Sequence, residues 1–261
     1  MNFDDFLTNN PHKIEIKELI KITNLAYKNW QVYWSNFISS YIYEDILEEF
    51  KKLNDFHYFV FGGYENSDRA KIACFRKSLE LEEKDLINKF PGNGIEIKGN
   101  FLFDNATETD FKDLLTKHGV AKNKIGDIWV TGERGAQGIL ATDNTLFIKE
   151  RYFLRDVEVQ INLINIKNLR TPIKRIEKII NTVEASIRID AIASAGFRLS
   201  RNKIADRIKR GHLSLNGIKI NKSTISIKVG DKLKLENKGV VEILEILQTK
   251  RERWKIKLIR K

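Results

Sequence analysis

The stretch that decides the fold is residues 197–220, which read FRLSRNKIADRIKRGHLSLNGIKI. Ser200 is a favoured N-cap residue, and the apolar residues Ile204, Ala205 and Ile208 follow it at helical spacing. Gly211 then supplies a C-terminal stop. The pattern predicts a short helix after Ser200 with one buried side.

The same segment places five cations on that short helix, from Arg201 to Arg210. Lys203, Arg207 and Arg210 share one side of it, at steps of four and three residues. Like charges at this spacing cost roughly a few tenths of a kcal/mol per pair. Phosphates would more than offset that cost through counterion release. Arg201 lies at the helix start, where free backbone N–H groups also favour an anion. The helix is therefore a candidate polyanion-binding element.

A hairpin and a second turn follow the basic helix. Asn216 and Gly217 both tolerate positive φ, so HLSLNGIKI predicts two strands joined by a type I′ turn. The triplet VGD predicts a second turn, and KLKLE, VVEILEIL and WKIKLIRK predict strands. Upstream, ASIRIDAIASAG predicts a helix that ends at Gly196. Residues 185–261 are thus predicted to form two helices against a small sheet.

The positive charge of the chain is concentrated in this region. The 261 residues include 46 Lys and Arg against 35 Asp and Glu, which gives a net charge of +11. Residues 181–261 hold 20 of the cations and 8 of the acids, whereas the first 180 residues hold 26 and 27. A surplus that served only solubility would be spread evenly. The distribution therefore indicates a binding module attached to a neutral body.

The rest of the chain predicts helices first and then a mixture of helices and strands. Residues 1–53 carry apolar side chains at helical spacing and are predicted as a helical N-terminal segment. Residues 54–166 alternate strand-like runs such as FHYFVF and IGDIWV with helix-like runs such as DFKDLLTKHGV and NTLFIKERYFL. That alternation predicts a compact domain of the ferredoxin-like kind. Residues 167–184 are predicted as a basic linker, and the expected fold class is α+β.

The residue types present exclude several kinds of site. Cys74 is the only cysteine, so an intrachain disulfide and a thiolate-rich zinc site are impossible, and we expect this side chain in the core. The four histidines lack metal-binding spacing, and GERGAQG predicts a turn between strands rather than a phosphate loop. No metal, cofactor or catalytic residue is predicted.

The sequence also bears on location. No apolar run reaches the length that spans a bilayer, and the N-terminus lacks the features of a secretory signal. We expect a cytoplasmic monomer, or a stromal one in an organism with plastids.

The order of helix, basic helix, Asn-Gly hairpin and Gly-Asp turn resembles the RNA-binding module of ribosomal protein S-four. The matching segments are RIDAIASAG, LSRNKIADRIKRG, LSLNG and VGD. The resemblance implies that the second helix and the hairpin cradle structured RNA. Carried over by position, the implied RNA-binding residues are Arg188, Arg198, Ser200, Arg201, Lys203, Arg207, Lys209, Arg210, Asn216 and Lys219. The chain departs from the family at His212-Leu213, where Arg-Val is common.

Two upstream segments, FGGYENSDRAKIACF and KNKIGDIWVTGERGAQGIL, resemble the central domain of the YlmH family. That likeness implies a helical N-terminal segment, a central domain like an RNA-recognition fold at residues 54–166, and an S-four-type module at 185–261. It also implies binding to rRNA or tRNA on the large ribosomal subunit and a role in rescuing stalled large subunits. NTVEASIRIDAIASAGF and GERGAQ are closer to a plastid branch, the photosystem II S-four domain proteins, and the family also has looser links to cell division.

Two other functions stay open from the sequence. The S-four-type module often accompanies pseudouridine synthases and rRNA methyltransferases, so the chain could be an RNA-modifying enzyme. Such an enzyme needs a catalytic Asp in a Gly-Arg-Leu-Asp context or a glycine-rich cofactor loop, and neither stands in residues 1–180. A photosystem II assembly factor whose basic face meets anionic lipid is the third hypothesis, although no amphipathic or lipidated anchor is evident.

Overall fold

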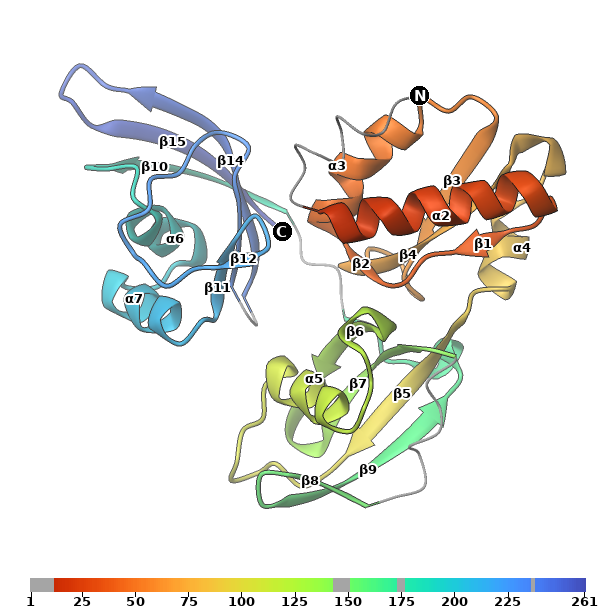
Figure 1. The fold of residues 1–261 in the computed structure, drawn as a ribbon. Coiled ribbons are helices and arrows are strands. Elements are labelled where there is room, and N and C mark those ends of the chain that lie inside the picture. Colours follow the sequence, from red (N-terminus) through yellow and green to blue (C-terminus); the bar gives the residue numbers. More distant parts are fainter. Residues whose placement is uncertain (1–11, 143–150, 173–176, 236–237) are drawn as a thin grey trace. The chain divides into compact units, whose positions relative to one another are not determined.

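The computed structural model describes residues 12–142, 151–172, 177–235 and 238–261. The chain divides into a first unit, Met1–Pro172, and a second unit, Ile173–Lys261 (Figure 1). Both units combine helices with antiparallel sheets, so the predicted α+β class is confirmed.

The first unit begins with two helices packed on a small sheet. Helices α2 (Lys13–Asn29) and α3 (Ser40–Phe50) share one core with strands β3 (Phe56–Phe61) and β4 (Arg69–Arg76). The short strands β1 (Tyr33–Trp34) and β2 (Ile38–Ser39) also pair with β4. The predicted helical segment 1–53 does contain these two helices, but its boundary at residue 53 is wrong, because the apolar sides of the helices are buried against β3 and β4.

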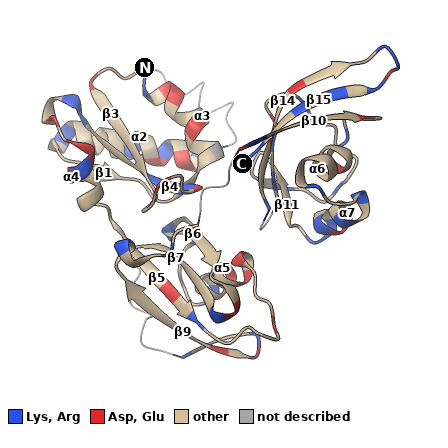
Figure 2. Ribbon diagram, turned by 180° about the vertical axis from the view of Figure 1, so that it is seen from behind, with Lys and Arg blue, Asp and Glu red and all other residues tan. Residues whose placement is uncertain are grey.

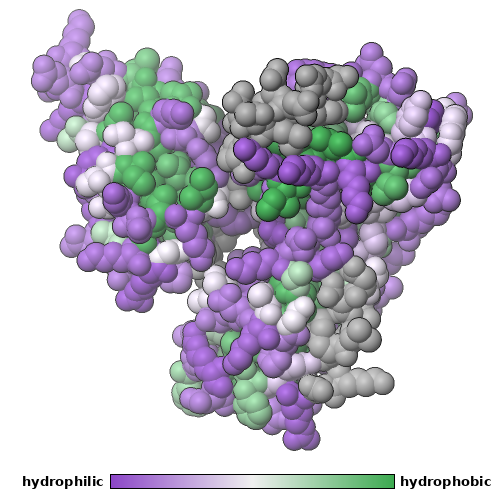
Figure 3. Space-filling view, viewed as in Figure 1, coloured by the Kyte–Doolittle hydropathy of each residue, from purple (hydrophilic) through white to green (hydrophobic). Residues whose placement is uncertain are grey.

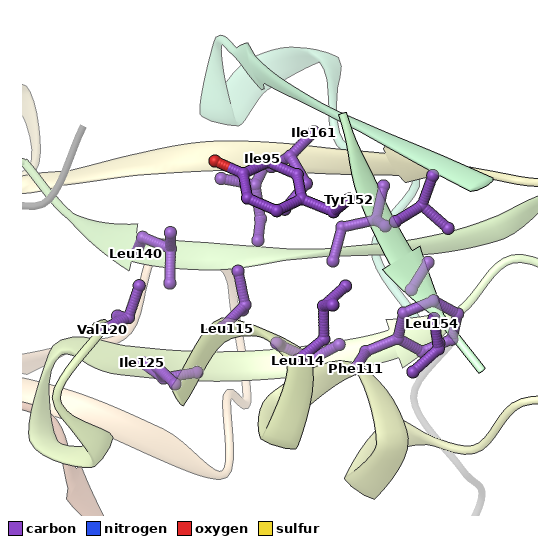
Figure 4. Packing of buried hydrophobic residues seen from close by; sticks show 14 of the residues in the cluster. Ile95, Phe111, Leu114, Leu115, Val120, Ile125, Leu140, Tyr152, Leu154 and Ile161 are labelled. Atoms are coloured by element: carbon purple, nitrogen blue, oxygen red, sulfur yellow. The ribbon is translucent and has the colours of Figure 1, made fainter. Parts of the chain in front are cut away.

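A second sheet of five antiparallel strands follows in the same unit, in the order β6-β7-β5-β9-β8. Its strands are β5 (Gly92–Lys98), β6 (Ile125–Val130), β7 (Gly135–Ala141), β8 (Tyr152–Leu154) and β9 (Val157–Ile164). Helix α5 (Glu108–Lys117) buries Phe111, Leu114 and Leu115 against the sheet (Figure 4). The run β9-β5-β7-β6, with α5 between β5 and β6, has the strand order of a ferredoxin-like sheet.

The second helix of a ferredoxin-like fold would fall between β7 and β9, where NTLFIKERYFL predicts one. Residues 144–150 of that stretch lie outside the described residues. The helix prediction is wrong for Tyr152–Leu154, which forms strand β8 paired with β9. Tyr152 and Leu154 are buried and Phe153 between them is exposed, which is the alternation of a strand. Helix α4 (Glu83–Asn88) connects the two sheets of this unit.

The second unit is a six-stranded antiparallel sheet with two helices. Its strand order is β10-β15-β14-β13-β11-β12. The strands are β10 (Lys178–Glu184), β11 (Leu213–Leu215), β12 (Ile218–Lys219), β13 (Lys232–Leu235), β14 (Gly239–Gln248) and β15 (Trp254–Arg260). Helices α6 (Ile189–Phe197) and α7 (Arg201–Lys209) pack into the core of this sheet through residues such as Ile192, Ile204 and Ile208.

The linker predicted over 167–184 is wrong in its second half. Residues 178–184 form β10 and pair along their whole length with β15, from Lys178 opposite Arg260 to Glu184 opposite Trp254. The β-branched residues of KIINTVE suit a pleated strand. Of the basic residues in the segment, Lys178 lies on this strand and is exposed, and Lys174 and Arg175 lie outside the described residues.

Candidate nucleic-acid interface

Helix α7 is the basic helix predicted from the sequence. Ser200 is its N-cap, and the hydroxyl of Ser200 accepts a hydrogen bond from the backbone N–H of Lys203 at 3.3 Å. Ile204 and Ile208 are buried in the core of the second unit, which fixes the rotation of the helix. The basic residues of α7, blue in Figure 2, are thereby kept out of that core.

Three cations of α7 face solvent without an ion pair to any residue that the structure describes. Lys203 and Lys209 are exposed, and Arg207 is half-buried. Arg198, which lies between α6 and α7, and Lys219 on β12 are exposed and equally without an ion pair to a described residue. These five side chains, Arg198, Lys203, Arg207, Lys209 and Lys219, are called the open cations below.

Two further arginines of the predicted set pair with carboxylates at the surface. A guanidinium nitrogen of Arg201 lies 3.2 Å from a carboxylate oxygen of Glu184, and Nε of Arg210 lies 3.2 Å from Oδ1 of Asp206. The side chains of the two arginines are 50% and 67% exposed. Ion pairs at such exposure contribute roughly 0–1 kcal/mol. The side chain of Asp206 is 53% exposed, so Arg210 can exchange its carboxylate for another anion at small cost. The side chain of Glu184 is only 17% exposed, so releasing Arg201 would leave a mostly buried carboxylate without its partner.

Arg188 is held more firmly than the other arginines. Its Nε and Nη2 donate to the two carboxylate oxygens of Asp190 at 3.0 and 3.1 Å, a bidentate contact. The side chain of Asp190 is only 13% exposed. Moving Arg188 to a phosphate would leave that carboxylate largely buried without its partner. The structure shows Arg188 bound to Asp190. Its contact with RNA stays a prediction.

The hairpin after α7 has the predicted turn. Asn216 and Gly217 have φ of 47° and 77°, the left-handed pair of a type I′ turn between β11 and β12. Nδ2 of Asn216 donates to Oδ1 of buried Asp231 at 2.9 Å, and Oδ1 of Asn216 accepts from the backbone N–H of Lys232 at 2.8 Å. The amide thus joins the hairpin to the turn before β13. Asn216 is a positioning residue in this geometry, with one N–H left for its predicted RNA contact.

The connection between α6 and α7 corrects one prediction. Gly196 does not end α6, which continues to Phe197, and Arg198 at the C-cap takes the left-handed conformation with φ of 55°. Gly196 serves packing instead, because a Cβ there would lie 2.9 Å from both methyl carbons of Val241. At the other end of α7, a Cβ on Gly211 would lie 3.9 Å from Cδ of Lys219. The hairpin cation Lys219 therefore lies beside the end of the basic helix.

The first unit contains a buried polar site that the sequence did not reveal. Asp127 is 8% exposed and accepts hydrogen bonds from the hydroxyl of Tyr64 at 2.8 Å and from the backbone N–H groups of Asp68 and Arg69. Burial raises the pKa of Asp127, against the effect of these donors. Nε of Arg69 donates to the carbonyl of Ile125 at 2.9 Å. The group ties β4 to β6, and Asp127 is a buried structural residue. The sequence feature that could have indicated this buried site is the single acid, Asp127, within the apolar run IGDIWV.

Two other acids of the first unit, Asp104 and Asp110, share one partner. Arg155 pairs with Asp104 and, at 3.0 Å, with Asp110. Asp110 also closes a capping box with Thr107 at the start of α5.

Cys74 is fully buried, as predicted, and burial raises the pKa of its thiol to about 11.

Across the described ranges, no group of three or more His, Cys, Asp or Glu side chains is placed to hold a metal ion. The helices in the described part of the chain are also too short or too polar to cross a membrane.

Comparison with known proteins gives two family matches. The family described as "YlmH, N-terminal" matches residues 12–79, and "Mitochondrial transcription rescue factor 1, C-terminal domain" matches residues 175–257. The first match covers α2 to β4 and the second covers nearly the whole second unit. Their limits agree with the structure, where β3 and β4 join the N-terminal helices and β10 joins the C-terminal sheet.

Two curated relatives and one solved structure are similar to the chain. "Ribosome-associated protein quality control protein P2" of Bacillus subtilis (strain 168) is 24% identical over 197 residues, which cover 75% of this chain and 74% of that protein. "Mitochondrial transcription rescue factor 1" of Mus musculus is 39% identical over 82 residues, which cover 30% of this chain and 32% of the mouse protein. The solved structure "Cell division protein ylmH from Streptococcus pneumoniae" aligns with a TM-score of 0.45 and 15% identity, over 59% of this chain and 92% of that chain.

The fold and the site define a two-unit α+β protein. In its second unit a basic helix packs against a six-stranded sheet, and the Asn-Gly hairpin forms two strands of that sheet. The chain is YlmH-like: residues 12–79 match the N-terminal model of that family, and 75% of the chain is similar to the Bacillus subtilis protein.

Proposed function

We propose that the chain is a non-enzymatic RNA-binding protein that acts on the ribosome through its second unit. The observation that carries the proposal is the group of open cations on α7 and the adjoining hairpin, in a part of the chain that holds the whole charge excess. Clustered cations on one face are the electrostatic footprint of nucleic-acid binding. The name of the Bacillus subtilis relative, a ribosome-associated quality control protein, supports the ribosome as the location.

The finer form of the proposal names the RNA and the setting. The target is structured rRNA or tRNA on the large ribosomal subunit, the setting is the cytoplasm, and the protein acts as a monomer in translation or its quality control. A rigid helix and hairpin on a sheet suit a folded RNA, whose phosphates hold a fixed spacing, better than a flexible strand. The predicted binding set, Arg188 to Lys219, divides into the open cations, Arg210 with an exposed carboxylate partner, Arg188 and Arg201 with mostly buried carboxylate partners, and the positioning residues Ser200 and Asn216.

The number of phosphates that the cations neutralise sets how steeply RNA affinity should fall with salt. Each phosphate neutralised contributes roughly 0.7–0.9 to the slope of log affinity against log salt. Five open cations then give a slope of about −4, and exchange of Arg210 from its exposed carboxylate partner to a phosphate would add to it.

The proposal is tested by reversing two open cations, with the variant Lys203→Glu/Arg207→Glu. These residues are four apart on α7, and neither has an ion pair with a described residue. We expect binding to structured rRNA in a filter assay to fall by at least about a hundredfold, and co-sedimentation with large ribosomal subunits to be lost. The matched control is Lys17→Glu/Lys21→Glu, two exposed lysines at the same spacing on α2.

The control carries the same change of net charge as the α7 variant. If both variants bind RNA equally well, α7 is not the binding face and the proposal fails. If both lose binding equally, the attraction is due to net charge alone, and the assigned face is equally refuted. Chemical analysis of nucleosides in RNA incubated with the protein tests the enzymatic alternative, since a modified nucleoside would contradict the non-enzymatic assignment.

A further inference from the structure

The hairpin of β14 and β15 extends beyond the rest of its sheet. Strand β13 pairs with β14 only as far as Glu242, whereas β14 continues to Gln248. At about 3.3 Å per residue, the six residues beyond Glu242 extend roughly 20 Å. A bulge between Ile243 and Glu245 marks where β14 leaves β13 behind. The far end of the hairpin is flanked only by β10 on the β15 side.

The tip of this hairpin is an ordered turn. The backbone N–H of Thr249 donates to the carbonyl of Arg253 at 2.7 Å, and the backbone N–H of Arg253 donates to Oγ1 of Thr249 at 3.1 Å. Glu252 takes the left-handed conformation that closes the turn, with φ of 55°. The side chains of the turn are thus presented from a fixed backbone.

The tip is strongly cationic and open. Lys250, Arg251, Arg253 and the adjacent Lys255 are all exposed, and none forms an ion pair with a residue in the described part of the chain. Glu252 is the one acid among them. Figure 2 shows this concentration of basic residues at the end of the β14–β15 hairpin. Three cations on one turn repel each other, so an anionic partner would relieve a cost that the fold imposes.

The tip is separate from the face on α7. The β11–β12 hairpin beside α7 lies at the opposite edge of the sheet from β10, and β14 and β15 lie between them. In Figures 1 and 2 alike, the tip and α7 stand at opposite ends of the second unit. One phosphate group cannot contact both places. A ligand that uses both must be an extended polyanion.

We infer that Lys250, Arg251 and Arg253 form a second binding site for the phosphate backbone of structured RNA, so that the second unit holds one long RNA at two points. This inference rests on the proposed function and extends it. RNA is favoured over an anionic membrane because the tip lacks an apolar anchor. Leu247 is the nearest exposed large apolar residue, and Figure 3 shows the tip itself as hydrophilic. Membrane-surface elements combine cations with inserted apolar side chains.

The test uses the full chain with Lys250→Gln/Arg251→Gln/Arg253→Gln and two RNAs of the same stem sequence. One stem-loop has about ten base pairs and the other about thirty, which is long enough to pass between two separated contacts. The wild-type protein should bind the longer RNA more tightly, by about tenfold or more, with a salt slope larger by roughly two to three. The tip variant should keep the short-RNA affinity and lose that gain.

The matched control is Lys77→Gln/Lys84→Gln/Lys117→Gln, which removes the same charge from exposed lysines of the first unit. Tip substitutions that keep the charge, Arg251→Lys/Arg253→Lys, should retain most of the gain. Thermal unfolding of each variant separates loss of contact from loss of fold. The side chains replaced are exposed, so the unfolding temperature should be unchanged.

Each outcome separates this inference from the function on which it rests. If the tip variant and the control bind the longer RNA as the wild type does, the tip is no RNA site, although α7 still is one. If wild-type affinity does not depend on RNA length, the two-point contact is refuted. If the tip variant loses binding to vesicles with about 30% anionic lipid while its RNA binding is unchanged, the tip is a membrane element instead. Failure of every protein to bind either RNA refutes the proposed function itself.

Discussion

Two substitutions of Asn216 separate the contribution of its side-chain hydrogen bonds from the contribution of its left-handed backbone conformation. Its amide makes one hydrogen bond to the carboxylate of Asp231 and one to the backbone of Lys232, and its backbone has φ of 47°. Asn216→Gly removes both side-chain hydrogen bonds and leaves the backbone conformation free of strain. Asn216→Ala removes the same hydrogen bonds and also forces an alanine into the left-handed region.

The structure gives the expected magnitudes. The bond to Asp231 is charge-assisted and partly buried, and its loss costs about 1.5 kcal/mol, while the more exposed bond to Lys232 adds about 0.5 kcal/mol. Asn216→Gly should therefore destabilise the hairpin by about 2 kcal/mol. A left-handed alanine costs roughly 1–2 kcal/mol, reduced by the extra freedom of glycine when unfolded. Asn216→Ala should lose about 0.5–1 kcal/mol more than Asn216→Gly.

The assay must report on the second unit alone, because two units need not unfold together. Native-state hydrogen exchange of peptides from residues 211–235 gives the opening free energy of the hairpin and the following turn. A double-mutant cycle with Asp231→Asn isolates the Asn216–Asp231 contact, with an expected coupling of about 1 kcal/mol. The reasoning is refuted if Asn216→Ala is as stable as Asn216→Gly, or if the cycle shows additivity.

Two further predictions concern the first unit. Asp127→Asn should lower its unfolding free energy by about 3 kcal/mol and its Tm by roughly 6–12 °C, because two backbone N–H groups and the Tyr64 hydroxyl lose a carboxylate acceptor. Calorimetry measures the Tm of this variant and of a control, Asp113→Asn, in which the replaced acid is exposed. Equal Tm values for the two variants would contradict the prediction. Since burial raises the pKa of Cys74 from 9.0 to about 11, this thiol stabilises the fold below pH 9 and loses that contribution between pH 9 and 11. At pH 8 an aromatic disulfide reagent should label Cys74 about a hundredfold more slowly in the native chain than in urea, and equal rates would refute the burial argument.

Local patterns predicted the second unit well because its signals are short-range. The N-cap at Ser200, the spacing of Ile204 and Ile208 and the Asn216-Gly217 turn each act within a few residues, and all three are confirmed. Strand β10 was missed because its partner is β15, more than 70 residues later in the chain. Two strands so far apart in the chain carry no local sequence signal of their pairing. The β-branched residues of β10 were the one sign of a strand, and the neighbouring lysines made the segment read as a linker.

The first unit shows the same limit in its domain organisation. The composition of FHYFVF and RAKIACF predicted strands correctly, but not the sheet to which they belong. Both strands pack against α2 and α3 rather than joining the ferredoxin-like sheet. Choosing between two sheets depends on long-range burial, which apolar periodicity does not encode. For the same reason, the partners of Asp127 could not be predicted, since Tyr64 and Arg69 lie about 60 residues upstream.

The ion pairs of the basic face decide which arginines can serve RNA. If every arginine of the set were bound to a buried carboxylate, the face would be neutral to an approaching phosphate. Arg188 and Arg201 come near that arrangement, because the side chains of their partners Asp190 and Glu184 are 13% and 17% exposed. Arg210 and its partner Asp206 are both more than half exposed, and their contact is worth little in water. A phosphate adds counterion release, which an internal carboxylate cannot offer. The pair of Arg210 therefore yields to RNA at small cost, whereas Arg188 and Arg201 have carboxylate partners that are costly to leave unpaired.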